Sequence, residues 1–279
     1  MGVFARVARR KCKIPEVARV KAFYSPDYVF ELGSHTFPTR KWALVAERLR
    51  AADAAVELVD PGLPPRELLL LAHGEEWVAK VLGGRMTLAD ETRLELPWSA
   101  GLATAHQKQV MGTLAACREA LSSGVGLHVG GGSHHACADH GEGFCVFNDL
   151  AAALLRLSAE GRIRRAAVVD LDVHQGNGTA AILAGRAGLA TFSMHQEDLY
   201  PLDGSGESAA SDLDIGLPLG TSDEKYLKLL NGALGPFLDE RRPALVVYQA
   251  GVDCWEGDLL GGLSLTAEGI AGRDRALAE

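Results

Sequence analysis

The segment DLDVHQGNG places Asp170, Asp172 and His174 at alternate positions directly after an apolar run. Alternate residues of an extended strand share one face, so this spacing predicts two carboxylates and an imidazole side by side. Such a set needs a cation to offset the repulsion and desolvation of the acids. Carboxylate and imidazole ligands together suit Zn²⁺ or Fe²⁺ better than Ca²⁺. Capping of the following helix explains one acid but not three alternating groups.

A pair of histidines follows another apolar run. Three glycines at 130–132 precede His134 and His135, and glycines let the backbone turn sharply or approach a ligand closely. A single histidine is more often a packed core residue. A histidine pair after a glycine turn at the end of a strand indicates a functional role.

A third apolar run ends in the sequence QAGVD, which closes with Asp253. Asp253 on its own could be a helix cap. Together with Asp172 and His174 it makes three ligands and leaves a position open for water, as in catalytic metal sites. A metal ion in such a site lowers the pKa of bound water to about 7 and so generates a nucleophile at neutral pH. The cysteines lack the spacing of a structural zinc site, so Cys137 and Cys145 are interpreted as packing residues, with Cys145 a candidate to line the pocket.

The surrounding elements explain how these clusters could meet. Apolar runs predict strands at 20–24, 55–59, 125–129, 166–173, 189–194 and 244–248. Helical patterns lie at 39–52, from about 66, and at 101–121, 148–159, 178–184 and 224–238. Apolar strands separated by helices favour an α/β fold with a parallel sheet covered on both faces. Ligands bind outside the carboxyl ends of such strands, so we expect one shared site.

Composition narrows the class of protein. The 279 residues are 47% hydrophobic and 23% charged, an ordinary globular balance, and the net charge of −8 argues against direct nucleic-acid binding. No apolar run approaches the length of a membrane span. Five cysteines without paired spacing favour a reducing, cytoplasmic location. The composition predicts no particular oligomeric state.

Residues 1–21 are basic and lack the apolar core of a signal peptide. We therefore expect them to form a flexible extension, with an organelle-type presequence or a contact to an anionic surface as the alternatives. Residues 22–279 are then expected to form a single catalytic domain.

Three segments carry a resemblance to a known family: GGGSHHACADHGEGFCVFND, VVDLDVHQGNG and YQAGVDCWEGDLLGGLSLT. They resemble the zinc-dependent histone deacetylase superfamily, which includes acetylpolyamine amidohydrolases and acetoin-utilisation proteins. The match looks closest to the class IV branch and its bacterial relatives, and extends from about Phe23 onward. It implies the arginase–deacetylase fold, a three-layer α/β/α sandwich around a central parallel sheet.

The resemblance also implies roles for individual residues. The zinc ligands would be Asp172, His174 and Asp253. The catalytic groups would be His135 as general base, His134 as the positive neighbour that assists the leaving group and oxyanion, Asp170 as the partner of His134, and Asn177 behind His135. The substrate tunnel would be formed by Gly143, Phe144 and Tyr200, and a structural K⁺ could lie near Asp170, Asp172, His174 and Ser193.

Two departures from the family pattern stand out. Asn177 occupies a position where some members carry a carboxylate, and an amide orients His135 without adding charge. The family also places an oxyanion-binding Tyr on a Gly-Gly-Tyr turn, which this sequence lacks before its last residue, Glu279. We therefore expect the C-terminal part of the fold to be missing and the strand at 244–248 to lack one neighbour.

The function implied is zinc-dependent removal of an acetyl or longer acyl group from lysine side chains, so the partner would be an acyl-lysine protein or an acylated small amine. One alternative is acetylpolyamine hydrolysis, with Asp139, Glu142 and Asp203 as acids at the tunnel mouth. The other alternative is a metal-binding scaffold with little or no turnover.

Overall fold

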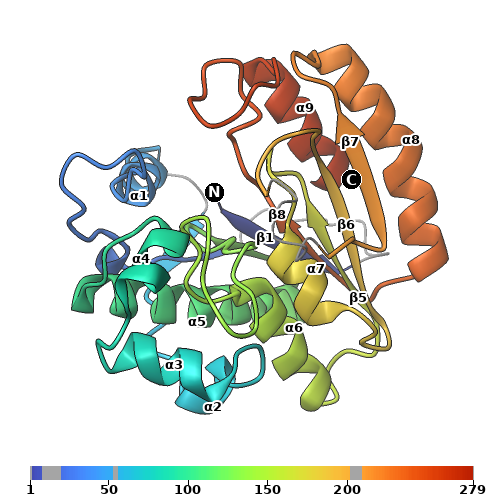
Figure 1. Cartoon of the computed structure of the whole chain (residues 1–279). Helices are drawn as coiled ribbons and strands as arrows, with labels where there is room; N and C mark the ends of the chain where they lie inside the picture. Colours follow the sequence, from blue (N-terminus) through green and yellow to red (C-terminus); the bar gives the residue numbers. More distant parts are fainter. Residues whose placement is uncertain (1, 8–19, 53–55, 202–208, 279) are drawn as a thin grey trace.

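One eight-stranded sheet organises the computed structural model, which describes residues 2–7, 20–52, 56–201 and 209–278 (Figure 1). The strands are β1 Val3–Val7, β2 Val20–Phe23, β3 Val56–Val59, β4 Val125–His128, β5 Ala166–Asp170, β6 Leu189–Gln196, β7 Leu213–Leu217 and β8 Leu245–Gln249. Their order across the sheet is β3-β2-β4-β1-β8-β5-β6-β7. The helices are α1 Lys41–Ala51, α2 Arg66–Leu69, α3 Glu75–Leu82, α4 Leu88–Leu94, α5 Ala100–Ser123, α6 Asp149–Ala159, α7 Asn177–Leu183, α8 Asp223–Arg241 and α9 Ala267–Ala278, with a 3₁₀ turn η1 Pro26–Tyr28.

Helices cover both faces of the sheet, and the buried side chains divide into two cores. Along β5, Val168 packs in the core that contains residues of α5 and α6, whereas Val169 packs with residues of α8 and α9. The alternation follows from the period of two in an extended strand. Figure 1 shows α5 and α6 on one side of the sheet and α8 and α9 on the other. The expected three-layer α/β/α sandwich is therefore confirmed.

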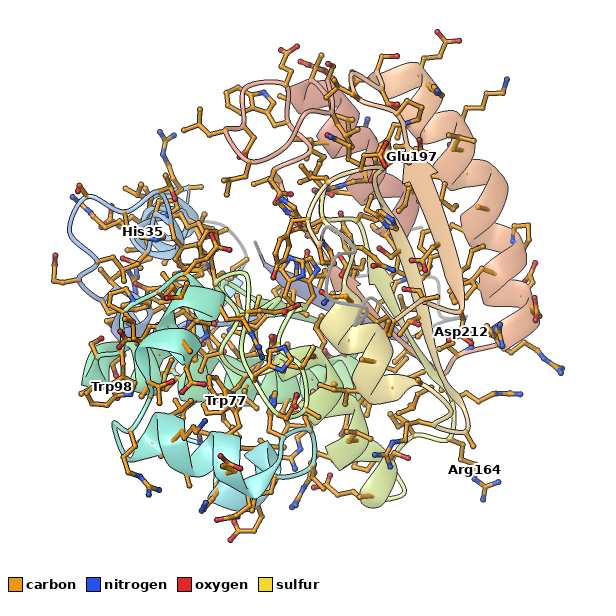
Figure 2. All side chains as sticks on the ribbon, viewed as in Figure 1. His35, Trp77, Trp98, Arg164, Glu197 and Asp212 are labelled. Atoms are coloured by element: carbon orange, nitrogen blue, oxygen red, sulfur yellow. The ribbon has the colours of Figure 1, made fainter. Side chains whose placement is uncertain are left out.

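The longest helix, α5, has clear signals at both ends. The Ser99 hydroxyl caps its first turn by accepting a hydrogen bond from the Leu102 backbone N–H at 2.9 Å, and Gly124 ends it in a left-handed conformation with φ of 101°. Its buried face is rich in alanine, which lets it lie close to the sheet. Within the same core, the buried Trp77 of α3 (labelled in Figure 2) donates a hydrogen bond from Nε1 to the Val146 carbonyl.

The strand β1 corrects the interpretation of residues 1–21. Val3–Val7 lies in the middle of the sheet, antiparallel to β4 on one side and to β8 on the other, and Ala5 is fully buried. The expectation of a flexible extension is therefore wrong for these residues. Basic side chains dominate this segment, and they hid a short apolar alternation of Val3, Ala5 and Val7. Residues 8–19 lie outside the described residues.

The pairing of β8 corrects a second expectation. We expected the strand at 244–248 to lack one neighbour, but β8 pairs with β5 in parallel and with β1 in antiparallel orientation. Both rows of its backbone groups therefore have partners within the sheet, which is parallel at every described pairing except those of β1. Within the described parts of the chain, no helix is long and apolar enough to cross a bilayer.

The position of β1 gives a testable prediction. Replacing Ala5 with Asp places a carboxylate in the middle of the sheet, so we expect the free energy of unfolding to fall by more than about 2 kcal/mol, the cost of burying a polar group without a partner. Urea denaturation followed by circular dichroism measures this. The matched control is Val7→Thr at a partly exposed position of the same strand, where a change within about 0.5 kcal/mol is expected. Equal stability of Ala5→Asp and the unsubstituted protein would contradict a central β1.

Candidate active site

Three loops leave the sheet at the same edge and bring the polar clusters together. They follow β4, β5 and β8, which run parallel to one another because β1 lies antiparallel between β4 and β8. Loops at the carboxyl ends of parallel strands meet outside the sheet, where α/β proteins bind ligands. The convergence expected from the sequence is therefore confirmed.

The possible metal ligands Asp172, His174 and Asp253 form one compact group. His174 Nδ1 lies 3.0 Å from Asp172 Oδ1 and 3.3 Å from Asp253 Oδ2, and one ligand atom from each residue lies within 4.8 Å of the others. The route differs from the expected one, because β5 ends at Asp170 and not at residue 173. Asp172 and His174 therefore reach the group from a bend after the strand, so the expectation of a shared strand face is wrong.

Electrostatics within this group suit a cation. Burial alone would lower the pKa of His174, but the hydrogen bonds and charges of Asp172 and Asp253 raise that pKa to about 10. Burial would raise the pKa of Asp172, yet His134 and His174 hold it well below its usual range. Burial and the charge of Asp172 raise the pKa of Asp253. Positive charge is thus required between the carboxylates, and a divalent metal ion could supply it in place of the His174 proton.

The two histidines of the glycine loop have opposite environments. His134 Nδ1 lies 2.7 Å from Asp170 Oδ2, and although burial opposes protonation, the charges of Asp170 and Asp172 raise the pKa of His134 to about 9. His135 stacks near it, with ring centroids 4.0 Å apart. Burial and the positive charges of His134 and His174 hold the pKa of His135 well below its usual range. One ring is therefore a cation and the other is neutral, which is the arrangement that separates an acid from a base.

Two buried groups outside the clusters hold these loops in place. Asp149, at the start of α6, accepts hydrogen bonds from the backbone N–H groups of Gly132 at 3.0 Å and Ser133 at 2.7 Å. Arg273 of α9 is fully buried and donates through one nitrogen to the carbonyls of Leu171 and Gly251. The first contact fixes the turn before the histidine pair, and the second braces the loops after β5 and β8. Sequence analysis assigned no role to either residue: Asp149 closes the segment that carries the histidine pair, and Arg273 is about 20 or more positions from the loops that it braces.

A cavity of about 500 Å³ opens onto this group. His135, His174 and Asp253 line it, together with Gly143, Phe144 and Tyr200, for which the family resemblance implied a place in a substrate tunnel. Further lining comes from residues that sequence analysis did not single out: Thr36, Phe37, Pro38, Lys41, Glu95, Leu199, Val252, Gly257, Asp258, Leu259 and Leu260. They lie in loops or at a helix start, where no repeating pattern marks them.

Gly143 has a steric reason to be glycine. Its φ of 50° lies in the left-handed region, and a Cβ at this position would lie 2.8 Å from the His135 ring and 2.9 Å from the Tyr200 ring. Any side chain there would push the histidine or the tyrosine away from the cavity. The absence of a side chain at Gly143 therefore lets His135 and Tyr200 lie close together in the cavity wall.

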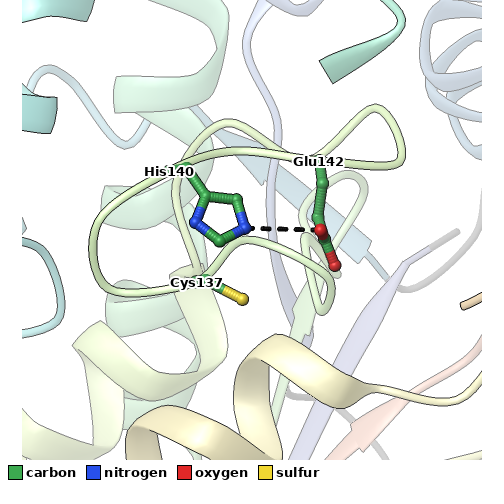
Figure 3. Close-up of side chains that lie close together, drawn as sticks. All are labelled: Cys137, His140 and Glu142. Carbon is green, nitrogen blue, oxygen red and sulfur yellow. Dashed lines mark hydrogen bonds and ion pairs between the residues drawn. The ribbon is translucent and has the colours of Figure 1, made fainter. Parts of the chain in front are cut away.

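A second group of possible metal ligands comprises Cys137, His140 and Glu142, with ligand atoms within 4.8 Å of one another (Figure 3). The spacing Cys-x-x-His-x-Glu was the available sequence signal, but Cys137 had been interpreted as a packing residue. Glu142 and Asp139 were expected at the tunnel mouth. Instead Glu142 contacts His140 and Asn177, and Asp139 contacts His140. Asp203 lies outside the described residues.

The other residues of the expected site are also close by. Asn177 Oδ1 lies 2.7 Å from His135 Nδ1. Asp170 is the register partner of Ser193 across β5 and β6. A K⁺ ion near Asp170 remains a prediction. Cys145 is buried away from the main cavity and borders a small neighbouring one.

Solved structures resemble this fold over most of the chain. The crystal structure of the HDA15 HD domain gives a TM-score of 0.73 at 21% identity and covers 93% of this chain and 78% of that one. The structure of an HDAC homolog complexed with SAHA gives a TM-score of 0.76 at 22% identity, with coverage of 92% and 75%. At these identities the likeness establishes the shared α/β architecture.

Sequence relatives extend over a similar range. The chain is 40% identical over 256 residues to an uncharacterized protein of Picosynechococcus sp., covering 90% of this chain and 84% of that protein. It is 30% identical over 272 residues to Histone deacetylase 2 of Arabidopsis thaliana, covering 92% and 70%. A histone deacetylase-like amidohydrolase of Pseudomonas aeruginosa is 32% identical over 177 residues, covering 61% and 45%.

The model of the histone deacetylase domain family matches residues 35–279, which include all three clusters of the site. The region matched is most of the chain, and the relatives and solved structures agree with it. The protein therefore belongs to the histone deacetylase domain family.

Proposed function

We propose that the protein is a zinc-dependent amidohydrolase that removes an acetyl or longer acyl group from lysine side chains of proteins. One observation carries the proposal: a single cavity is lined by His174 and Asp253 of the possible metal group and by the neutral imidazole of His135. A neutral imidazole beside a metal site is suited to accept a proton from water. Membership of the family supports the same reaction class.

The metal would be held by Asp172, His174 and Asp253. Two carboxylates and one imidazole fit Zn²⁺, with Fe²⁺ as the alternative. When bound, the ion acts as a Lewis acid that polarises the amide carbonyl and makes water more acidic. The pKa of His174, which Asp172 and Asp253 raise to about 10, supports this assignment, because the two carboxylates favour a positive charge between them.

His135 and His134 would move and balance charge during the reaction. The Nδ1 atom of His135 faces Asn177 Oδ1, which leaves Nε2 to take a proton from the attacking water. The amine of the substrate then departs with that proton, because an amide does not readily expel an unprotonated amine. His134, held positive by Asp170, would stabilise the negative charge that develops on the carbonyl oxygen.

The aromatic lining of the cavity supports a substrate with an apolar stem. Phe144 and Tyr200 line it, and the Tyr200 ring packs edge-on against His135 with centroids 4.9 Å apart. Aromatic walls favour the methylene stem of lysine, whose burial contributes about 0.8 kcal/mol per CH₂. Two further acids line the cavity, Glu95 and Asp258, and they favour acetylpolyamine hydrolysis as the second candidate.

Turnover measurements separate these candidates. An acetyl-lysine peptide and an acetylated polyamine are compared by kcat/KM at equal zinc content. Higher kcat/KM for the peptide supports lysine deacylation, whereas higher kcat/KM for the polyamine supports the second candidate. Full zinc content without turnover of either would identify a metal-binding scaffold and contradict the proposed reaction.

The first prediction from the proposed function concerns the metal. Asp172→Ala, His174→Ala and Asp253→Ala should each remove most of the bound zinc, because a three-ligand site has no spare ligand. Metal content is measured by elemental analysis after dialysis against a weak chelator. Glu76→Gln at an exposed site is the control and should keep its zinc. Full zinc content in Asp253→Ala would remove this residue from the metal site.

The second prediction concerns the base. His135→Ala should keep its zinc but lose about 10²–10⁴ in kcat, the usual contribution of general base catalysis. The measurement is steady-state turnover at matched zinc content. Loss of zinc from this variant would mean that His135 is a ligand and not the base.

The third prediction concerns substrate reach. Shortening the acetylated side chain by two methylenes should lower kcat/KM about tenfold, from about 0.8 kcal/mol per methylene. A change of peptide residues distant from the acetylated side chain is the control and should have a smaller effect. Equal kcat/KM for the long and short side chains would argue against a narrow apolar tunnel.

A further inference from the structure

A continuous chain of hydrogen bonds runs from the cavity, behind His135, to the exposed side chain of Asp139. His135 Nδ1 lies 2.7 Å from Asn177 Oδ1, and Asn177 Nδ2 donates to Glu142 Oε1 at 2.5 Å. The other carboxylate oxygen, Glu142 Oε2, lies 3.3 Å from His140 Nε2 (Figure 3). His140 continues through Nδ1 to Asp139 Oδ1 at 2.7 Å. The whole chain is built from the loop at 137–142 and the start of α7.

The direction of these bonds follows from what each group can do. An ionised carboxylate only accepts hydrogen bonds, so Glu142 must face the NH₂ end of the Asn177 amide. The carbonyl end then faces His135, and since it too only accepts, His135 Nδ1 must carry the hydrogen. In a neutral imidazole the other nitrogen, Nε2, is then the unprotonated one. The opposite amide orientation would place two acceptor oxygens against each other beside Glu142.

Glu142 is kept in its ionised form by its neighbours. Asn177 Nδ2 donates to its Oε1, and His140 Nε2 lies 3.3 Å from its Oε2, so each carboxylate oxygen faces a nitrogen donor. Both nitrogens of His140 face carboxylate oxygens, of Glu142 and of Asp139, an arrangement that an imidazolium with a donor at each nitrogen satisfies. The side chain of Glu142 is 13% exposed, so solvent competes little for its oxygens.

We propose that Glu142 is a positioning residue for His135: by accepting a hydrogen bond from Asn177 Nδ2 it fixes the amide so that His135 carries its hydrogen on Nδ1 and keeps Nε2 free to act as the base. The catalytic consequence rests on the proposed function, whereas the choice of tautomer does not. Asn177 alone has no such preference, because an amide can turn over and present its NH₂ group to His135. Glu142 fixes the orientation of the Asn177 amide, which the amide alone does not determine.

A pair of exchanged side chains tests the proposal. Glu142→Gln removes the obligatory acceptor, so the Asn177 amide can face either way. Asn177→Asp sets two carboxylates against each other. In the double variant Glu142→Gln/Asn177→Asp, the glutamine amide donates to the new carboxylate, whose second oxygen again accepts from His135 Nδ1. The double variant therefore restores the order of donors and acceptors, with the carboxylate at position 177 and the amide at position 142.

The expected results are a loss in each single variant and a recovery in the double variant. We expect kcat to fall at least about tenfold in Glu142→Gln, as part of the 10²–10⁴ that a general base contributes, with KM and zinc content little changed. The double variant should recover most of the kcat lost in Glu142→Gln. Glu76→Gln, an exposed change of the same kind, is the control. A double variant no faster than Glu142→Gln would overturn the proposal.

A second measurement does not depend on turnover. In the zinc-loaded protein labelled with ¹⁵N-histidine, the His135 signals are identified by their loss in His135→Ala. They should report hydrogen on Nδ1 in the unsubstituted protein and a mixture of tautomers in Glu142→Gln. An unchanged Nδ1–H tautomer in Glu142→Gln would overturn the proposal even where kcat falls. Absence of acyl-lysine turnover in the unsubstituted protein would instead contradict the proposed function, while this measurement would still decide the role of Glu142.

Discussion

Two carboxylates buried around one imidazole nitrogen set the conditions for the rest of the site. Asp172 and Asp253 both lie within 3.3 Å of His174 Nδ1, and neither could remain ionised there without positive charge. The same negative charge, with that of Asp170, keeps His134 protonated. The positive charges of His134 and His174 then help to keep His135 neutral. The opposite states of the two adjacent histidines thus follow from the acids around the metal position.

Such a group forms only because rigid elements supply its parts. β5 and β8 are neighbours in the sheet, so the loops that carry Asp172 and Asp253 start side by side. Arg273, a buried residue of α9, donates hydrogen bonds to a carbonyl in each of these loops. Helix α9 is thereby linked to the metal position. The site is therefore supported from both layers of the sandwich, with α6 holding the histidine turn through Asp149.

Much of this arrangement could be predicted from local sequence, and the remainder depends on long-range contacts. The runs that became β4, β5, β6 and β8 are apolar and end in polar clusters, so both the sheet and the site at its edge could be inferred. β1 could not, because five residues in a basic segment become buried only through long-range contacts, with β4 and β8 in the sheet and with α5 on one face. The bend after Asp170 was missed for a related reason, since nothing in the alternation of Asp172 and His174 marks where the ladder stops. Glu142 was recognised as an acid near the site, but its partner Asn177 lies 35 positions away.

The central place of β1 also has a consequence for the order in which the chain assembles. Val3 pairs with Gln249 and Val7 with Leu245, so β1 is synthesised long before β8 and gains this partner only when nearly all of the described chain has been made. Contacts of such high sequence separation are slow to form, because the entropy cost of closing a long loop comes before the contacts add any stability. Until then the edges of β4 and β8 that β1 will cover are open to pairing with other strands. Newly made chains are therefore expected to depend on protection from association during this interval, more than the finished fold does.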